Sequence, residues 1–246
     1  MIAIVTMLID HIGAAVLARL LMVNGLGELD QTNTDAIMQW LSANGALYGT
    51  YTVMRMIGRV AFPIFCFLLV EGFLHTHDVK KYAMRLGLFA LLSEIPFDLA
   101  FSSKILEFNY QNVFFTLFIG LLTMIAYRAV EEKEEWGQAW KVILYILIVA
   151  AGMALAYFLK TDYAEKGVFC IMVLYIFRKK KMWQLIAGCA SFIWETPALF
   201  GFIPIAFYNG TRGWKMKYFF YIFYPAHLLI LYLLCYFMGI SGYSAV

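Results

Sequence analysis

The sequence predicts an all-α fold, a polytopic bundle of membrane-spanning helices that forms one domain over residues 1–246. Hydrophobic residues make up 63% of the chain and charged residues only 14%, below the roughly 25% of a soluble domain. The apolar residues also fall into runs close to the roughly 20 residues with which a helix crosses a bilayer. We therefore expect a multi-pass protein in contact with membrane lipid.

Seven apolar runs are long enough to be spans: residues 1–24, 54–74, 84–102, 112–130, 140–159, 163–178 and 217–239. The first run lacks the basic start and the cleavage site of a signal peptide, so we expect a retained span. The stretch 183–208 carries Glu195 and Pro197 at its middle. Because a straight span would bury both near mid-membrane, a hairpin of two short helices is favoured.

The sidedness of the helices follows from the cations in the loops. Lys and Arg mark the cytoplasmic side of a membrane, and here they concentrate in four loops, residues 75–85, 127–141, 177–183 and 209–217. These loops alternate consistently with the spans only if 183–208 goes out and returns. The prediction is about nine crossings, with the N-terminus inside and the C-terminus outside.

Composition and spacing exclude several classes of site. A net charge of +3 on a uniformly apolar chain leaves no basic domain to hold nucleic acid. His75 and His77 have the spacing of a metal-ligand pair, but no third ligand accompanies them, so no metal is expected. The cysteines stand alone in apolar runs, which predicts packing residues rather than disulfides: Cys66, Cys170, Cys189 and Cys235.

Two histidines are expected at mid-membrane. His11 lies about 16 Å along the first helix at 1.5 Å per residue, and His227 falls at a similar depth in the last span. A buried ionisable group costs about 2.5–3.5 kcal/mol on insertion scales, so each should face a partner or a cavity. A histidine there is either a packing residue or a natural general base. The adjacent Asp10 diverges from His11 by about 100° and needs a partner of its own.

Charged stripes are expected near the outer ends of the second and third spans. Arg55 and Arg59 are spaced i, i+4, as are Glu94 and Asp98, and Asn112 opens the fourth span in the same region. Complementary stripes at one depth predict an ion-pair network. Such a network either specifies helix packing or contributes to a polar site.

Five stretches resemble the TraX family of bacterial inner-membrane proteins: "IAIVTMLIDHIGA" (2–14), "RMIGRVAFPIFCFLLVEGFLHTHDVKKYAMRLGLFALLSEIPFDLAF" (55–101), "QNVFFTLFIGLL" (111–122), "YNGTRG" (208–213) and "KYFFYIFYPAHLLILYLL" (217–234). The resemblance covers nearly the whole chain and implies a multi-pass protein of the cytoplasmic membrane. The family is named for a member that acetylates the N-terminus of conjugative pilin. More distantly, the chain is similar to the transmembrane acyltransferase superfamily, whose members take acyl groups from coenzyme A.

The resemblance implies roles for individual residues. His11 would deprotonate an amine or hydroxyl acceptor, and Asp10 would position it or pair with an arginine such as Arg59. The donor, acetyl-CoA, would be held through its phosphates by three cations: Lys80, Lys81 and Arg85. The remaining expected substrate-site residues are Arg55, Glu94, Asp98, Asn112, Asn209, Tyr224 and His227.

The sequence leaves the acceptor open among a peptide, a sugar and a lipid. It also leaves two other classes of function open. A transporter or flippase-like protein would use the same polar cavity without covalent chemistry. A structural partner of a pilus or secretion assembly would need no reactive histidine.

Overall fold

The computed structural model describes residues 1–30, 32–211 and 217–244, and these residues form helices without a named strand. Five helical segments in this part of the chain are long and apolar enough to cross a membrane: Ile2–Val23, Thr34–His75, Val113–Glu131, Gln138–Phe158 and Phe219–Phe237. The all-α class and the multi-pass character are confirmed. The nine crossings and the inward N-terminus stay predictions.

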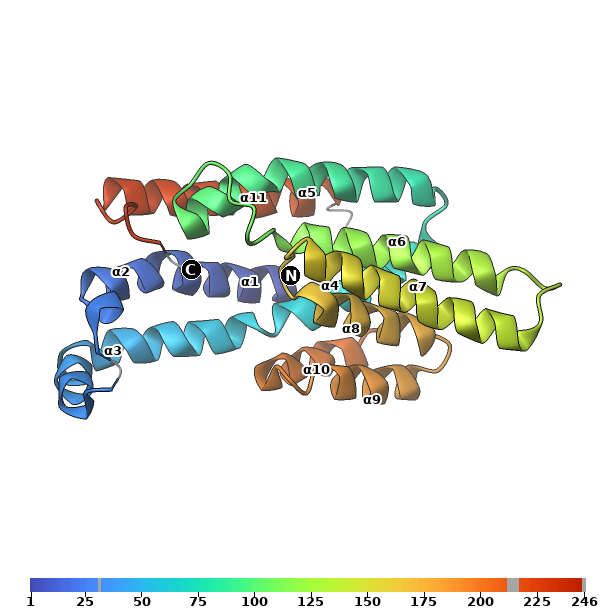
Figure 1. Ribbon diagram of the computed structural model, residues 1–246, viewed down its shortest axis with the longest axis horizontal. Coiled ribbons are helices and arrows are strands. Elements are labelled where there is room, and N and C mark those ends of the chain that lie inside the picture. The colour runs from blue at the N-terminus through green and yellow to red at the C-terminus, as the bar shows by residue number, and fades with distance from the viewer. Residues whose placement is uncertain (31, 212–216, 245–246) are drawn as a thin grey trace. The chain divides into compact units, whose positions relative to one another are not determined.

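The chain divides into two compact units that are interleaved in sequence (Figure 1). The first unit comprises Met1–Ala61, Ile95–Glu107 and Trp214–Val246, and the second comprises Phe62–Glu94 and Phe108–Gly213. Each unit is built from helices that pack side by side, and each is described in turn.

The first unit is assembled on the N-terminal helix. Helix α1 (Ile2–Ile12) continues through the π-helix η1 (Gly13–Leu17) into α2 (Ala18–Val23). A 3-10 turn, η2 (Leu26–Glu28), leads to the long helix α3 (Thr34–Gly58), which packs against α1, η1 and α2. Helix α11 (Lys217–Phe237) packs against α1 and η1.

The predicted span over 54–74 is not one helix. Helix α3 ends at Gly58, and α4 (Ala61–His75) begins after two intervening residues. Pro63, the third residue of α4, has no N–H to donate to the carbonyl of Arg59 four residues earlier, so the hydrogen-bond ladder cannot run through. Arg55 consequently lies in the last turn of α3, and Arg59 lies at the junction between α3 and α4.

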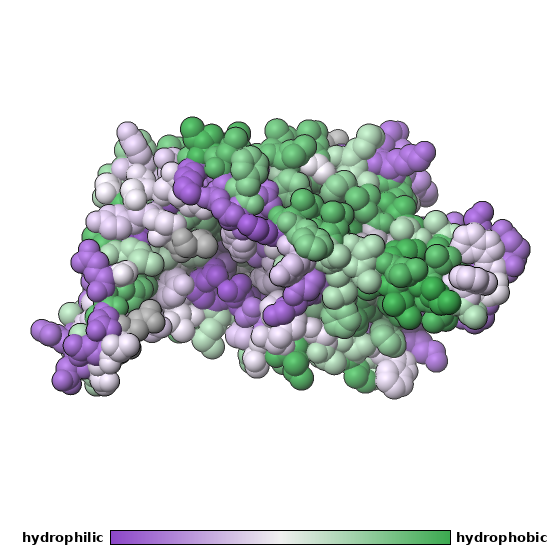
Figure 2. Space-filling model, in the orientation of Figure 1, coloured by the Kyte–Doolittle hydropathy of each residue, from purple (hydrophilic) through white to green (hydrophobic). Residues whose placement is uncertain are grey.

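The second unit is a bundle around α6 (Val113–Glu131), α7 (Gln138–Phe158) and α8 (Ala164–Ile176), which pack on one another. Small residues allow this packing. A Cβ at Gly120 would lie 2.5 Å from Ile171, and one at Gly152 would lie 2.2 Å from the Thr123 hydroxyl oxygen. Helix α7 exposes large apolar side chains, and Figure 2 shows green side chains covering it, as expected for a lipid-facing helix.

The stretch 183–208 is a pair of short helical pieces. Helix α9 (Lys181–Ser191) is followed by a turn that holds Glu195, then by the 3-10 helix η3 (Thr196–Gly201) and α10 (Phe202–Ala206). Helix α10 packs back against α9, and the Phe202 ring lies so close to Gly188 that a Cβ there would clash at 2.5 Å. The break falls at the residues that favoured a hairpin.

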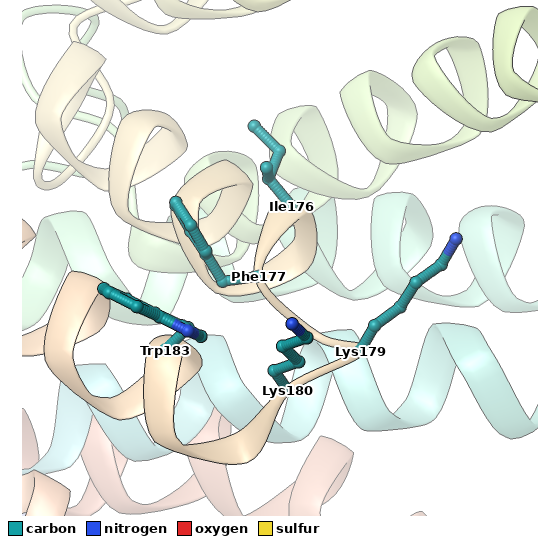
Figure 3. A pocket seen from close by; sticks show the side chains of 5 residues that line it. All are labelled: Ile176, Phe177, Lys179, Lys180 and Trp183. Carbon is teal, nitrogen blue, oxygen red and sulfur yellow. The ribbon is translucent and has the colours of Figure 1, made fainter.

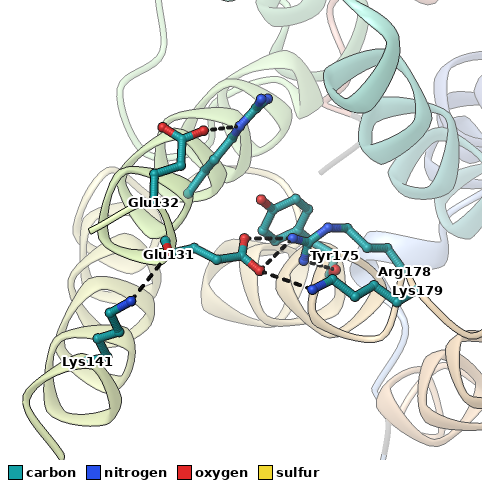
Figure 4. A network of polar contacts seen from close by, with 7 residues as sticks. Glu131, Glu132, Lys141, Tyr175, Arg178 and Lys179 are labelled. Atoms are coloured by element: carbon teal, nitrogen blue, oxygen red, sulfur yellow. Dashed lines mark hydrogen bonds and ion pairs between the residues drawn. The ribbon is translucent and has the colours of Figure 1, made fainter. Parts of the chain in front are cut away.

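Two of the loops expected on the cytoplasmic side meet at one end of this unit (Figure 4). Arg178 donates to both carboxylate oxygens of Glu131, at 2.6 and 2.9 Å, and its guanidinium lies 3.9 Å from the centroid of Tyr175. Lys141 donates to the Glu131 carbonyl at 3.4 Å. Loops 127–141 and 177–183 therefore share one end of the bundle.

Helix α5 (Val79–Ser102) passes from the second unit into the first and contains Pro96. Its start is capped by Asp78, whose Oδ1 accepts the Lys81 N–H at 2.9 Å. This hydrogen bond is the largest cause that lowers the pKa of Asp78. The carboxylate therefore protects the first turn of the helix.

We expect this protection to depend on pH. Because the pKa of Asp78 is lower in the folded chain, its contribution is full above the unfolded value of about 3.9 and is lost as pH falls through the folded pKa. Hydrogen exchange at the Lys81 amide should show a protection factor that drops on acidification. In Asp78→Asn, which keeps an acceptor that does not titrate, the protection factor should stay constant. A constant value in the unmodified protein would contradict the assignment.

Candidate functional site

Five of the residues expected at a polar site come together inside the first unit. Asp10 and His11 lie on α1, Arg55 on α3, and Tyr224 and His227 on α11. They are joined by an ion pair, a hydrogen bond and edge-on ring contacts. Segments from both ends of the sequence thus contribute to one site.

The ion pair joins Asp10 to Arg55, with 2.7 Å between Oδ2 and Nη1. The carboxylate side chain is 13% exposed and the guanidinium side chain 25%, so both are partly withdrawn from solvent. Asp10 was expected to pair with an arginine such as Arg59. The structure gives it a contact with the other arginine of that stripe.

Two glycines let α1 and α3 approach closely enough for this pair. A Cβ at Gly58 would lie 2.1 Å from the Cβ of Asp10, closer than side-chain atoms ever come. A Cβ at Gly13 would lie 3.2 Å from the Cβ of Met54. Because glycine has no side chain, Asp10 can occupy the space that a side chain at position 58 would fill.

The two histidines are directly hydrogen-bonded. Nδ1 of His11 lies 2.6 Å from Nε2 of His227, and the rings are nearly parallel, at 3°. Nδ1 of His227 lies 2.7 Å from the carbonyl oxygen of Phe223, one turn earlier on α11. His227 is 5% exposed, whereas His11 is only half-buried. The second histidine is thus covered, and the first retains an accessible edge.

Aromatic rings enclose the pair. The rings of Tyr224 and Phe101 meet His11 edge-on, with centroid separations of 5.8 and 5.5 Å. Phe223 stacks on His227 at 4.8 Å. Such packing restricts the imidazoles to one orientation and leaves few polar groups beside them.

The π-helix η1 begins two residues after His11 and was not predicted. Its wider turn is closed by the hydrogen bond from Ala18 N–H to the Gly13 carbonyl. In a regular α-helix, the side chains of residues 11 and 19 would point about 80° apart around the helix axis. One inserted residue reduces that difference to about 20°, which brings His11 and Arg19 to one face of the helix.

Arg19 is the residue of this region that the sequence reasoning missed. It is fully buried, and its donors are directed at neutral acceptors: the carbonyls of Ala15, Leu99, Ala100 and Tyr243, the hydroxyl of Ser103 and the sulfur of Cys235. Two of these carbonyls end α5, where helices leave acceptors unpaired and carry partial negative charge. The arginine thereby ties the first helix to the end of α5 and to the chain after α11.

The carboxylates of the third predicted span bind N–H groups. Asp98, in the first unit, accepts the backbone N–H of Glu107 at 2.7 Å. In the second unit, Asn112 donates to the Ala90 carbonyl at 2.8 Å and to Glu94, and it caps α6 by accepting the Phe114 N–H. Among the described residues Asp98 forms no ion pair, and Arg55 of the expected network pairs with Asp10 instead.

The expected donor-binding cations lie at the start of α5, in the second unit. Lys80 and Lys81 are exposed, and Lys81 pairs with Asp78 at 3.1 Å. Arg85 is half-buried, and its Nε atom is buried without a hydrogen-bond partner in the part of the chain that the structure describes. Asn209, also in this unit, accepts the N–H and the hydroxyl of Thr211.

A second basic region lies at the turn between α8 and α9. A hollow of about 380 Å³ is lined by Ile176, Phe177, Lys179, Lys180 and Trp183 (Figure 3). Figure 3 shows the two aromatic side chains, Phe177 and Trp183, on the same side of the turn, with the Lys179 side chain extending in the opposite direction. Cations beside an exposed tryptophan are typical of the membrane–water interface.

Apolar helices around a buried polar site define a multi-pass membrane protein. The chain belongs to the TraX family: the family described as TraX protein matches residues 1–235. The chain is 27% identical over 215 residues to a protein named probable fimbrial assembly protein FimC, serogroup H1, from Dichelobacter nodosus. That alignment covers 74% of this chain and 82% of the relative. No solved structure matches the chain.

We expect Arg19→Met to destabilise the first unit. The substitution leaves several buried carbonyls without their donors, a loss of about 3 kcal/mol or more. The apparent Tm in detergent should therefore fall by many degrees. Arg128→Met is the control, because Arg128 pairs with Glu132 on an exposed helix surface and contributes little. A similar Tm for both variants would contradict the role of Arg19.

We expect Gly58→Ala to separate α1 from α3, since the new methyl group occupies the position of the Asp10 side chain. Overpacking of this kind costs about 1–3 kcal/mol. Gly45→Ala on the same helix is the matched control, because a Cβ there meets nothing within 4 Å. Thermal unfolding should show a loss only for position 58. Equal stability of both variants would mean that the close approach is not needed.

Proposed function

We propose that this chain is a membrane-embedded acetyltransferase. It would move an acetyl group from acetyl-CoA to an amine or hydroxyl acceptor in or across the membrane. The observation that carries the proposal is the interior imidazole of His11, which is hydrogen-bonded through one nitrogen and half-open to its surroundings. Membership of the TraX family supports the same chemistry.

His11 is the proposed general base. No hydrogen bond to a described residue involves its Nε2, so this nitrogen can accept a proton from an acceptor N–H or O–H. The acceptor atom then attacks the thioester carbonyl, the carbon–sulfur bond breaks, and the proton passes from His11 to the departing sulfur. Direct transfer needs no covalent intermediate on the enzyme.

The ion pair beside His11 has a supporting part in this proposal. Asp10 holds Arg55 and thereby keeps the helix that carries His11 against α3. Arg59 lies one turn further along the arginine stripe, and we propose it as the donor that stabilises negative charge on the carbonyl oxygen.

The donor would be bound through its phosphates by Lys80, Lys81 and Arg85. The residues fit this task, because two are exposed ammonium groups and Arg85 has a buried Nε–H without an acceptor among the described residues. When bound, acetyl-CoA supplies an activated acyl group on a thiol leaving group. Because the basic loops mark the cytoplasmic side, we propose that the donor comes from the bacterial cytoplasm and that the protein resides in the cytoplasmic membrane.

The proposed acceptor is the N-terminal amine of a pilin or a related surface peptide. The relative from Dichelobacter nodosus is named as a fimbrial assembly protein, which supports this choice over a sugar or a lipid headgroup. We also propose that the remaining polar residues contact the substrate: Glu94, Asp98, Asn112, Asn209 and Tyr224.

The test combines transfer and donor binding. Membranes that contain the protein should transfer label from radiolabelled acetyl-CoA to a pilin N-terminal peptide, and His11→Ala should abolish the transfer. His75→Ala is the control, because His75 is an exposed histidine at the end of α4. In purified protein, acetyl-CoA should raise the Tm of the His11→Ala variant as well, which shows that it is folded.

Donor binding is tested separately by Arg85→Ala, which should lose that stabilisation while Lys133→Ala in another loop retains it. Full transfer by His11→Ala would overturn the assignment of the base. Donor-independent flux of a substrate into proteoliposomes, with no acetyl transfer, would favour a transporter instead.

A further inference from the structure

Three polar groups in the first unit form a continuous hydrogen-bonded line. It runs from the carbonyl oxygen of Phe223 to Nδ1 of His227 at 2.7 Å, and from Nε2 of His227 to Nδ1 of His11 at 2.6 Å. The line ends at Nε2 of His11, which makes no hydrogen bond to a described residue. The Phe223 carbonyl at the other, fixed end determines which nitrogen is the donor in each of these hydrogen bonds.

The fixed end is a carbonyl, which only accepts hydrogen bonds. Nδ1 of His227 must therefore carry a proton. In a neutral imidazole only one nitrogen is protonated, so Nε2 of His227 is an acceptor. Nδ1 of His11 must then be the donor across the 2.6 Å contact, and the lone pair of His11 is left on Nε2.

The surroundings favour the neutral form of both rings. His227 is 5% exposed and is covered by the rings of Phe223 and Tyr224. The charged groups nearest in sequence and space, Asp10 and Arg55, are paired with each other at 2.7 Å. An imidazolium in such an apolar interior would lack a counter-ion of its own.

We propose that His227 is a positioning residue that fixes His11 as the tautomer protonated on Nδ1. The accessible Nε2 of His11 is thereby kept as the proton acceptor. The tautomer follows from the geometry alone, while its catalytic meaning rests on the proposed acetyltransferase function. A carboxylate fills the equivalent place in many hydrolases, but a neutral histidine holds the orientation here without placing a buried charge beside the base.

A competing arrangement is a relay, in which His227 takes the proton onward from His11. The variant His227→Gln distinguishes positioning by His227 from a proton relay through it. Its amide oxygen can accept the His11 Nδ1–H, but the amide cannot carry a proton at neutral pH. His227→Gln therefore preserves positioning and abolishes a relay, whereas His227→Ala removes both.

The first experiment reads the tautomer without any activity. The protein is purified in detergent with ¹⁵N-labelled histidine, and long-range ¹H–¹⁵N correlation spectra identify which ring nitrogens are protonated. His11→Gln and His227→Gln assign the two interior histidines, since the other two, His75 at the end of α4 and His77 just after it, are exposed. We expect both interior rings to be neutral and protonated on Nδ1.

The variants complete this experiment. In His227→Gln the tautomer of His11 should be retained, and in His227→Ala it should change to protonation on Nε2 or to a mixture. A charged His11, an Nε2–H tautomer in the unmodified protein, or an unchanged tautomer in His227→Ala would each overturn the proposal.

The second experiment measures acetyl transfer. We expect His227→Ala to lose about ten-fold or more in kcat, a loss typical of residues that orient a functional group. Its KM for acetyl-CoA should stay unchanged. His227→Gln should retain most of the rate. An inactive His227→Gln with the correct His11 tautomer would show a relay and overturn positioning. No transfer by the unmodified protein would refute the proposed function and leave the tautomer result standing.

Discussion

The close approach of α1 and α3 at Gly58 is the constraint on which the first unit depends. Only a missing side chain at this position leaves room for Asp10, and only with Asp10 in that space does its carboxylate reach Arg55 at 2.7 Å. The pairing fixes the rotation of α1 about its own axis. Because His11 follows Asp10 directly, the same rotation directs the imidazole toward α11 and His227.

The π-helix then resolves a conflict between the two halves of the first span. His11 must face His227 on α11, while Arg19 must reach the end of α5 and the Tyr243 carbonyl. A regular α-helix would point them about 80° apart. The additional residue in η1 brings them to one face, so a local departure from ideal geometry is offset by two long-range polar contacts.

Several buried polar groups of this unit bind one another or the backbone. Arg19 compensates carbonyls that a helix end leaves unpaired, Asp10 compensates Arg55, and Asp98 holds the backbone of the loop after α5. Two of these groups keep an atom without a partner among the described residues: Oδ1 of Asp98 and Nε2 of His11. Of the two residues, His11 is the one whose free nitrogen can act as a general base near neutral pH.

The sequence by itself determined the all-helical membrane class, the break in 183–208, and the presence of two histidines at one depth, because these follow from hydropathy, proline and distance along a helix. It could not place Arg19, which reads as an ordinary flanking cation until its acceptors, at residues 15, 99, 100, 103 and 243, are brought together. Nor could it select Arg55 among the arginines near Asp10, or the Glu107 N–H as the group that Asp98 binds. Depth can be counted along a chain, but the direction in which a side chain faces depends on how helices rotate against one another. That rotation was decided by the tertiary structure, through the contact at Gly58 and the π turn after His11.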